Sequence, residues 1–283
     1  MSETTNHNRP IRRILVALNA SPDELDLIDA ALQWATKLEA ELAGLFVEDI
    51  NLLNLAEFPF ALEVQRTIVQ RREVDRQRME RWLRAEAERV QRALQQQAEG
   101  RAVRWRFELA RGEILAETLA AAHQSDLLII SRRFQDALMQ ARRSNVLAAI
   151  IAQAQCAVLI AGHDGHDGSA VHAVIHNVPA AGRVLAAASR FAAIDNVPLM
   201  VINTAATAEL CAQHETAIRA LLAQHPGEFE LENAVADTPS DSLHDVNFKG
   251  SKLLVMDRDS VVADERSVEV LVDELSCPVL LIN

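Results

Sequence analysis

The chain contains no long run of apolar residues among its 283 positions. A membrane-spanning helix needs about 18 to 20 of them in succession, and no segment approaches that length. The segment from Met1 to Arg13 is polar and lacks the apolar centre of a secretory signal. We therefore expect a cytoplasmic protein with no membrane partner.

Cysteine is also scarce. Cys156, Cys211 and Cys277 are an odd number, and none of them belongs to a C-x-x-C pair. Buried free thiols explain them better than disulfides or metal ligands do, which agrees with an intracellular location. The signatures of several enzyme classes are missing too: there is no G-x-S-x-G elbow, no Walker loop and no H-E-x-x-H helix. We find no catalytic constellation and expect a protein that is not an enzyme.

Basic residues are few in one part of the chain only. The net charge is −12, and residues 1–162 hold 21 basic and 22 acidic side chains, whereas residues 163–283 hold 7 and 18. A surface this acidic repels phosphates, so we expect no nucleic-acid partner.

After a polar segment, 1–10, that we expect to be disordered, residues 11–162 alternate between strand and helix patterns. Ser21 as N-cap and Pro22 at the first helical position indicate where the first helix begins. Such a series predicts a parallel sheet with helices on both faces. Short apolar runs predict strands at 13–18, 42–47, 103–110, 126–131 and 156–161.

A long helix is predicted over residues 61–98. Met79, Leu83, Val90 and Leu94 share one apolar stripe, which we expect to be covered. Arginines and acidic residues alternate around it. They suit either a surface for a polyanion or partner helix, or a solvated face with ion pairs, and the interspersed acids favour the solvated face.

The segment 163–170 is predicted to be a linker, because glycines and polar residues interrupt the pattern there. His163, His166, His172 and His176 gather around it with two aspartates. Zinc or nickel chelation is compatible with these residue types, but a polar linker running into a strand explains them better.

The order of elements then repeats over residues 171–283, which indicates an internal duplication. The two domains are therefore predicted to be 11–162 and 171–283. Strands are expected at 171–176, 197–203, 229–235, 252–256 and 277–282, with helices at 179–193, 208–223 and 268–275.

Three segments carry a family resemblance: Asp126 to Phe134, Ser144-Asn145, and the closing strand Cys156 to Ile160. They resemble the second half of a universal stress protein domain, where a strand leads into a loop of the form G-x2-G-x9-G-[S/T] and a later strand reads C-P-V-L. Cys277-Pro278-Val279-Leu280 matches that closing strand again. The resemblance implies two tandem α/β domains, each a parallel five-stranded sheet with helices on both faces, Rossmann-like and similar to the adenine nucleotide alpha hydrolases.

Family members that hold ATP use an aspartate after the first strand together with the glycine loop. Asn19 stands at the aspartate position, and Ser131, Phe134 and Ser144 stand at the three glycines. Phenylalanine cannot bring backbone N–H groups close to a phosphate as glycine does. The usual ATP-binding mode is therefore disfavoured, and we expect no cofactor.

An alternative keeps a ligand in this loop, because four arginines flank it and guanidinium groups bind anions: Arg132, Arg133, Arg142 and Arg143. Surface arginines at helix ends explain them better. In the second domain Asn177 takes the place of Asn19, and acidic residues of segment 257–265 stand where phosphates would lie. The candidate binding residues are Asn19, Ser21, Ser131, Arg132, Arg133, Ser144 and Asn145.

The function that the resemblance implies is a cytoplasmic stress-response binding or regulatory protein. One alternative is a small-molecule-binding or nucleotide-binding member, with weak ATP hydrolysis, that uses the first loop. Another is an adaptor that docks an unknown protein partner through helix 61–98. Family homodimers join through their closing strands, so we expect the two domains to pack as an intramolecular pseudo-dimer, and a further homodimer is compatible with this arrangement.

Overall fold

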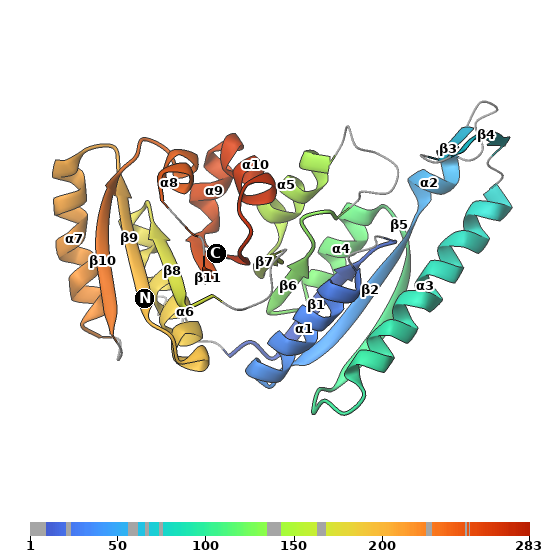
Figure 1. The fold of residues 1–283 in the computed structure, drawn as a ribbon, viewed down its shortest axis with the longest axis horizontal. Coiled ribbons are helices and arrows are strands. Elements are labelled where there is room, and N and C mark those ends of the chain that lie inside the picture. Colours follow the sequence, from blue (N-terminus) through green and yellow to red (C-terminus); the bar gives the residue numbers. More distant parts are fainter. Residues whose placement is uncertain are drawn as a thin grey trace, which may run out of the picture.

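The structure is a computed structural model that describes residues 10–20, 24–55, 62–65, 68–73, 76–134, 143–162, 168–224, 228–246, 248 and 250–283. The segment 1–9 and the linker residues 163–167, with His163 and His166, lie outside the described residues. Two halves lie side by side along the long axis of the molecule (Figure 1). The first half consists of β1 (Arg13–Leu18), α1 (Glu24–Leu38), β2 (Glu41–Asp49), α2 (Ile50–Leu55), β3 (Leu62–Gln65), β4 (Ile68–Glu73), α3 (Arg76–Ala98), β5 (Trp105–Gly112), α4 (Ile114–Ala122), β6 (Leu127–Ile130), α5 (Arg143–Gln153) and β7 (Ala157–Ile160).

The second half repeats this order with shorter elements. It consists of β8 (Ala170–Ile175), α6 (Val178–Asp195), β9 (Leu199–Ala205), α7 (Ala208–Leu222), β10 (Phe229–Val235), α8 (Pro239–Asp245), β11 (Ser251–Asp257), α9 (Arg258–Ala263), α10 (Glu265–Asp273) and β12 (Val279–Ile282). Hydroxyl caps begin two of its helices, because Thr207 accepts a hydrogen bond from the backbone N–H of Leu210 and Thr238 accepts one from that of Asp241.

Ten of the strands form one sheet in the order β10-β9-β8-β11-β12-β7-β6-β1-β2-β5. Within each half every neighbouring pair of strands is parallel. From the outer edge inward the order is β5-β2-β1-β6-β7 in the first half and β10-β9-β8-β11-β12 in the second, so the two halves have the same topology. The prediction of two α/β domains with parallel five-stranded sheets is therefore confirmed.

The two closing strands β7 and β12 pair with each other, and this is the one antiparallel contact in the ten-stranded sheet. Leu159 lies opposite Leu280, its own counterpart in the repeat, while Ile160 faces Val279 and Val158 faces Leu281. A register that pairs equivalent residues places a local twofold axis between the halves. Gly162, just after β7, lets the backbone of the first half pass close to the segment that leads into β12. A Cβ at this position would lie 2.5 Å from the carbonyl oxygen of Ser276.

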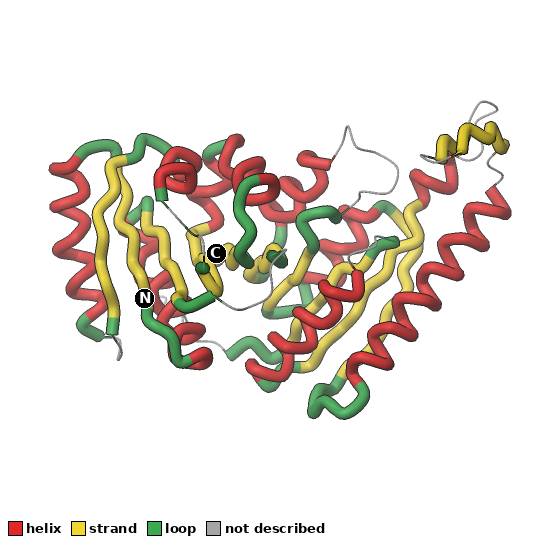
Figure 2. The backbone as a smooth tube through the Cα atoms, in the orientation of Figure 1, coloured by secondary structure: helices red, strands yellow, loops and turns green. Residues whose placement is uncertain are grey.

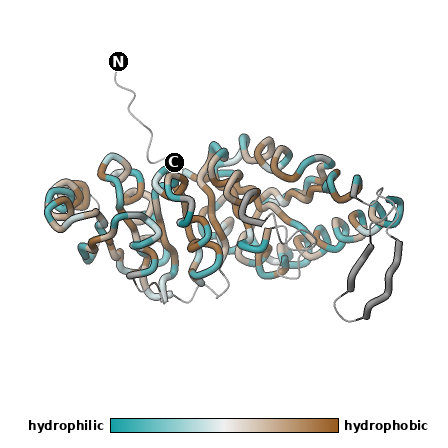
Figure 3. Tube along the Cα trace, turned by 90° about the horizontal axis from the view of Figure 1, so that it is seen from above, coloured by the Kyte–Doolittle hydropathy of each residue, from teal (hydrophilic) through white to brown (hydrophobic). Residues whose placement is uncertain are grey.

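Side chains that alternate along the strands build a core on each face of the sheet. One core holds Ile14, Val16, Leu127 and Ile129 together with residues of α1, α3, α6 and α7. The other holds Leu15, Leu128, Ile130 and residues of α4, α5, α8, α9 and α10. Both helix layers continue across the two halves (Figure 2), and apolar strands run between helices whose outer faces are polar (Figure 3).

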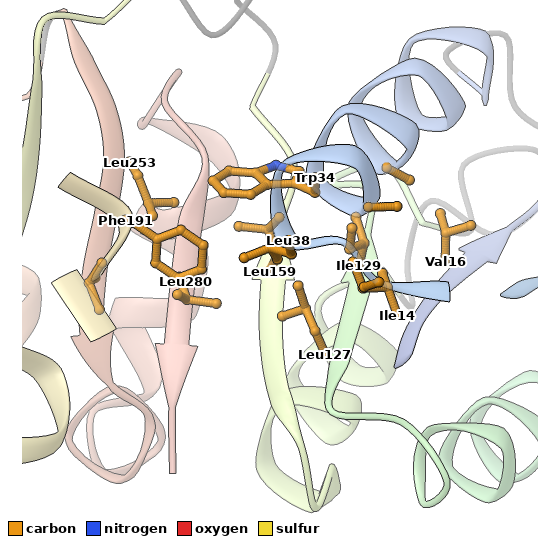
Figure 4. Close-up of a cluster of buried hydrophobic side chains, with 14 of the residues drawn as sticks. Ile14, Val16, Trp34, Leu38, Leu127, Ile129, Leu159, Phe191, Leu253 and Leu280 are labelled. Carbon is orange, nitrogen blue, oxygen red and sulfur yellow. The ribbon is translucent and has the colours of Figure 1, made fainter. Parts of the chain in front are cut away.

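The first core crosses the junction through α1 and α6. The rings of Trp34 and Phe191 meet edge to face with centroids 5.1 Å apart, above Leu159 and Leu280 of the closing strands (Figure 4). Lys37 Nζ lies 2.6 Å from Asp195 Oδ1 beside them. Aromatic pairs of this geometry add about 0.5 to 1.5 kcal/mol to the burial of their area, so the junction is a packed core.

The prediction of one helix over 61–98 is wrong in its first part. Helix α3 begins at Arg76, and the segment before it contains the antiparallel hairpin of β3 and β4. Leu62, Val64, Ile68 and Val69 are β-branched or apolar residues in short alternating runs, which suit a strand as well as a helix. The later part is confirmed, because Leu83, Val90 and Leu94 are buried and Met79 is half-buried.

The arginines of α3 keep contact with water, as expected from the interspersed acids. Arg78, Arg81 and Arg92 are exposed, and Arg89 lies 2.8 Å from Glu86 of the same helix. Sequence reasoning did not foresee three short helices, α2, α8 and α9. In the described part of the chain, every helix is too short or too polar to span a lipid bilayer.

Candidate functional site

The expected ligand site lies where β1 and β6 end. These two strands are parallel neighbours, so their carboxyl ends meet at one edge of the sheet, the place where ligands bind to open α/β sheets. Asn19 follows β1 and Ser131 follows β6. The structure thus brings these two predicted site residues to the same edge.

A tight turn follows β6. The backbone N–H of Arg133 donates to Ser131 Oγ at 3.1 Å, and the N–H of Phe134 donates to the Ser131 carbonyl oxygen at 3.1 Å. Backbone donors that a phosphate would need are thereby used within the turn. Phe134 itself is only 4% exposed and belongs to the core on the α4 and α5 face of the sheet.

Phe134 and Asn19 line a cavity of about 20 Å³. Thr118 lies in its wall, and the hydroxyl oxygen of Thr118 is buried with no hydrogen-bond partner among the described residues. A space of this size holds about one water molecule, which would satisfy that hydroxyl. It cannot hold a nucleotide, so the phenylalanine occupies the place that the family's second loop glycine leaves open.

Arg132 points away from this cavity and into the second half. Its Nε donates to the carbonyl oxygen of Ala161 at 3.0 Å, and its two terminal nitrogens donate to the carbonyl oxygens of Leu271 and Cys277. The side chain is 5% exposed, and burial lowers the pKa of its guanidinium to about 10. Even so the group stays charged at neutral pH, and its donors bind carbonyls across the junction instead of an anion.

Arg258 occupies the equivalent position in the second half. Leu127 to Ile130 corresponds to Leu253 to Met256, so Arg132 and Arg258 each stand two residues after the last of these matched positions. Arg258 donates to the carbonyl oxygen of Ala154 in the first half, and burial lowers its pKa. Each half therefore sends one arginine to the backbone that leads into the other half's closing strand, an arrangement we call the arginine exchange.

The remaining candidate residues of the first half do not converge on the turn in the described structure. Arg133 has an exposed side chain. Ser21 and Arg142 lie outside the described residues, whereas Ser144 and Asn145 belong to α5 but their side chains lie outside the described part. Among the described residues, Asn19 and Ser131 are thus the only candidates at the edge of this site, where they lie beside Phe134.

The acidic loop of the second half is built differently from the expectation. Residues 258–273 form α9 and α10, and Asp257 and Asp264 cap these helices. Asp257 accepts from the backbone N–H and the hydroxyl of Ser260 at 3.0 Å, and Asp264 accepts from the Ser267 hydroxyl at 2.7 Å. Two of the carboxylates therefore hold helices in place.

Two histidines of the second half, His172 and His176, form hydrogen bonds to residues of neighbouring strands. His172 Nδ1 lies 3.0 Å from Ser251 Oγ, and His176 Nδ1 lies 2.9 Å from Thr204 Oγ1. Burial lowers the pKa of both imidazoles, so they are neutral at pH 7. No group of side chains suited to a metal ion occurs among the described residues.

The profile of the universal stress protein family matches residues 10–162 of the chain, which is the whole first half. This protein belongs to the universal stress protein family. No curated protein matches its sequence.

Solved structures extend the likeness to the second half. A universal stress protein from Archaeoglobus fulgidus DSM 4304 has 14% identity and a TM-score of 0.70, with 96% of both chains covered. A protein of unknown function from Pseudomonas aeruginosa PAO1 has 18% identity and a TM-score of 0.57, covering 98% of this chain and 94% of that one. The cytoplasmic domain of a prokaryotic cation chloride cotransporter has 12% identity and a TM-score of 0.52, with 96% and 95% covered. At these identities the likeness shows the fold alone.

Sequence reasoning missed Arg258 and the role of Arg132. A comparison of the two halves would have found the pair, because both arginines stand at the same distance from Leu127-Leu128 and Leu253-Leu254. Their acceptors are backbone carbonyls of the opposite half. No residue pattern in the sequence marks such acceptors.

Proposed function

We propose that this universal stress protein is a binding or regulatory protein of the stress response that works without ATP in the family's usual site. The observation that carries the proposal is the burial of Phe134 beside Asn19, with only about 20 Å³ left between them. The arginine exchange supports it, since Arg132 is held in the junction by three backbone carbonyls.

We further propose that the protein acts in the cytoplasm and catalyses no reaction. Three buried free cysteines support the location, because thiols stay reduced in that compartment. The absence of catalysis is supported by the way the candidate residues are used: the described ones close a turn, fill a core or bind backbone carbonyls.

The adaptor alternative loses support at α3. Its apolar stripe packs inside the first half, where Val90 and Leu94 are fully buried, so that face cannot dock a partner. The nucleotide-binding alternative requires Phe134 to leave its core position. Removal of a buried phenylalanine from a core costs about 3 to 5 kcal/mol, which a weakly held ligand does not offset.

Titration calorimetry with ATP and Mg²⁺ tests the proposal. We expect no binding heat from the wild-type protein, because the cavity beside Asn19 is too small for a nucleotide. A dissociation constant in the low micromolar range, worth about 8 kcal/mol, would contradict this. Deletion of the gene in its host provides the second readout: survival should fall under at least one stress of a tested panel. A Phe134→Leu variant, which keeps an apolar side chain in the core, should restore it.

A further inference from the structure

A cleft of about 470 Å³ opens between the two halves at the edge of the sheet where the strands of the first half begin. Arg13 at the start of β1, Ala157 at the start of β7 and Ile282 at the end of β12 form part of its wall, and α6 forms another part. Because Asn19 and Ser131 follow the ends of β1 and β6, the cleft and the ligand position of the first half lie at opposite edges of the sheet. The strands of the second half run the other way, so the carboxyl ends of β11 and β12 lie at the edge that holds the cleft.

Arginines dominate the charge of this cleft. Arg13, Arg183 and Arg190 line it, and Asp126 is the one acidic side chain among the described residues of its wall. Oδ2 of Asp126 already accepts from the backbone N–H groups of Arg12 and Arg13, each at 2.9 Å. The wall therefore carries an excess of positive charge.

The position of these arginines is informative because the second half is acidic. Residues 163–283 contain 7 basic side chains and 18 acidic ones, and Arg183 and Arg190 are two of those seven. Both stand on α6, seven residues apart, so the same face of the helix presents them. A chain with a net charge of −12 thus concentrates positive charge in a cavity between its halves.

One of the arginines is fixed in orientation. A terminal nitrogen of Arg183 donates to Asp257 Oδ1 at 3.0 Å, and Asp257 is itself held by Ser260. The Arg183 side chain remains 29% exposed. Between the charges the cleft has an apolar surface from Ile11, Ala187 and Ile282.

We propose that this cleft is a binding site for a small organic anion with a phosphate or carboxylate group and an apolar body. Its volume falls in the range of about 300 to 1,000 Å³ that is usual for small-molecule sites. Guanidinium groups bind both kinds of anion through paired N–H donors. The ligand would contact both halves and stabilise their junction.

The experiment measures binding of two probes, pyrophosphate for phosphate groups and citrate for carboxylate groups, by calorimetry and by the melting temperature at constant ionic strength. We expect at least one probe to bind saturably to the wild type and to raise its melting temperature. The double variant Arg13→Gln/Arg190→Gln should bind that probe with a dissociation constant at least about ten times higher than that of the wild type. Arg219→Gln is the matched control, because Arg219 on α7 pairs with Glu215 and does not line the cleft.

Equal binding by all three proteins would overturn the proposal, since it would show a general effect of salt on the surface. Absence of binding by both probes at about 10 mM, far above the dissociation constants of specific sites, would overturn it as well. If the double variant does not fold, Arg13→Gln alone replaces it, because Arg13 is exposed at the start of its strand. An Asn19→Ala variant should bind the probe like the wild type, because Asn19 lines the other cavity and not the cleft. That result separates this site from the one beside Asn19.

Discussion

At the scale of single residues, the arginine exchange joins the two halves. Arg132 and Arg258 occupy equivalent positions, and each donates to backbone carbonyls of the opposite half. A buried guanidinium is costly unless its donors are paired, and all three nitrogen atoms of Arg132 have an acceptor. Arg132, which the sequence offered for anion binding because it flanks the loop, is therefore a structural residue of the junction.

Replacement of Arg132 should show this directly. We expect Arg132→Met to lower the free energy of unfolding by about 2 to 4 kcal/mol, because hydrogen bonds from a charged donor are lost and buried carbonyls are left unpaired. Urea denaturation followed by circular dichroism measures the change. Arg133→Met, at the neighbouring exposed position, should stay within about 0.5 kcal/mol of the wild type; equal losses in both variants would assign Arg132 no special role.

At the scale of helices and strands, the sequence predicted those elements that a local pattern of apolar residues marks. The five strands of each half follow from short apolar runs, and the buried stripe of α3 follows from its helical spacing. The segment before Arg76 could not be assigned in the same way. Short runs such as Leu62 to Gln65 are compatible with both the spacing of a helix and the alternation of a strand. Helices α8 and α9 have 7 and 6 residues, too few for a periodic signal to stand out.

The stripe of α3 gives the prediction at this scale. The double variant Leu83→Asp with Val90→Asp should unfold the first half or leave it strongly destabilised, because both side chains are buried. Thermal melting and solution mass measure the outcome. As the control, Arg76→Gln with Arg84→Gln removes the ion pairs to Glu80 and Glu48 and should cost about 1 kcal/mol or less. An unchanged melting temperature in the aspartate variant would show that the stripe is accessible.

At the scale of the whole molecule, the sequence predicted the duplicated fold but not how the candidate site is filled. In the sequence, Phe134 at the position of the family's second loop glycine indicated only that the phosphate-binding loop was lost. That the ring turns into the core, and that Arg132 turns toward the second half, depends on contacts more than 100 residues apart in sequence. The cleft lined by Arg13 and Arg190 is likewise formed by both halves together.

One continuous sheet and two shared cores predict how the molecule unfolds. We expect a single cooperative transition in calorimetry, with equal calorimetric and van't Hoff enthalpies, because β7–β12 pairing and the Trp34–Phe191 contact couple the halves. Trp34→Ala should lower the midpoint and keep one transition, whereas Gln224→Ala at the far end of α7 should leave it unchanged. Two separate transitions in the wild type would show that the halves are independent.

The pairing of the closing strands also limits how the protein can assemble. A strand has two hydrogen-bonding edges, and β7 uses both of its own on β6 and β12, while β12 uses both on β7 and β11. In the ten-stranded sheet, as far as the chain is described, only β5 and β10 keep a free edge. Strand β10 presents the exposed side chains of Glu230 and Glu232. Two such acidic edges repel each other. A second copy that joined through the ten-stranded sheet would therefore have to use β5, because both closing strands are already paired on each side within one chain.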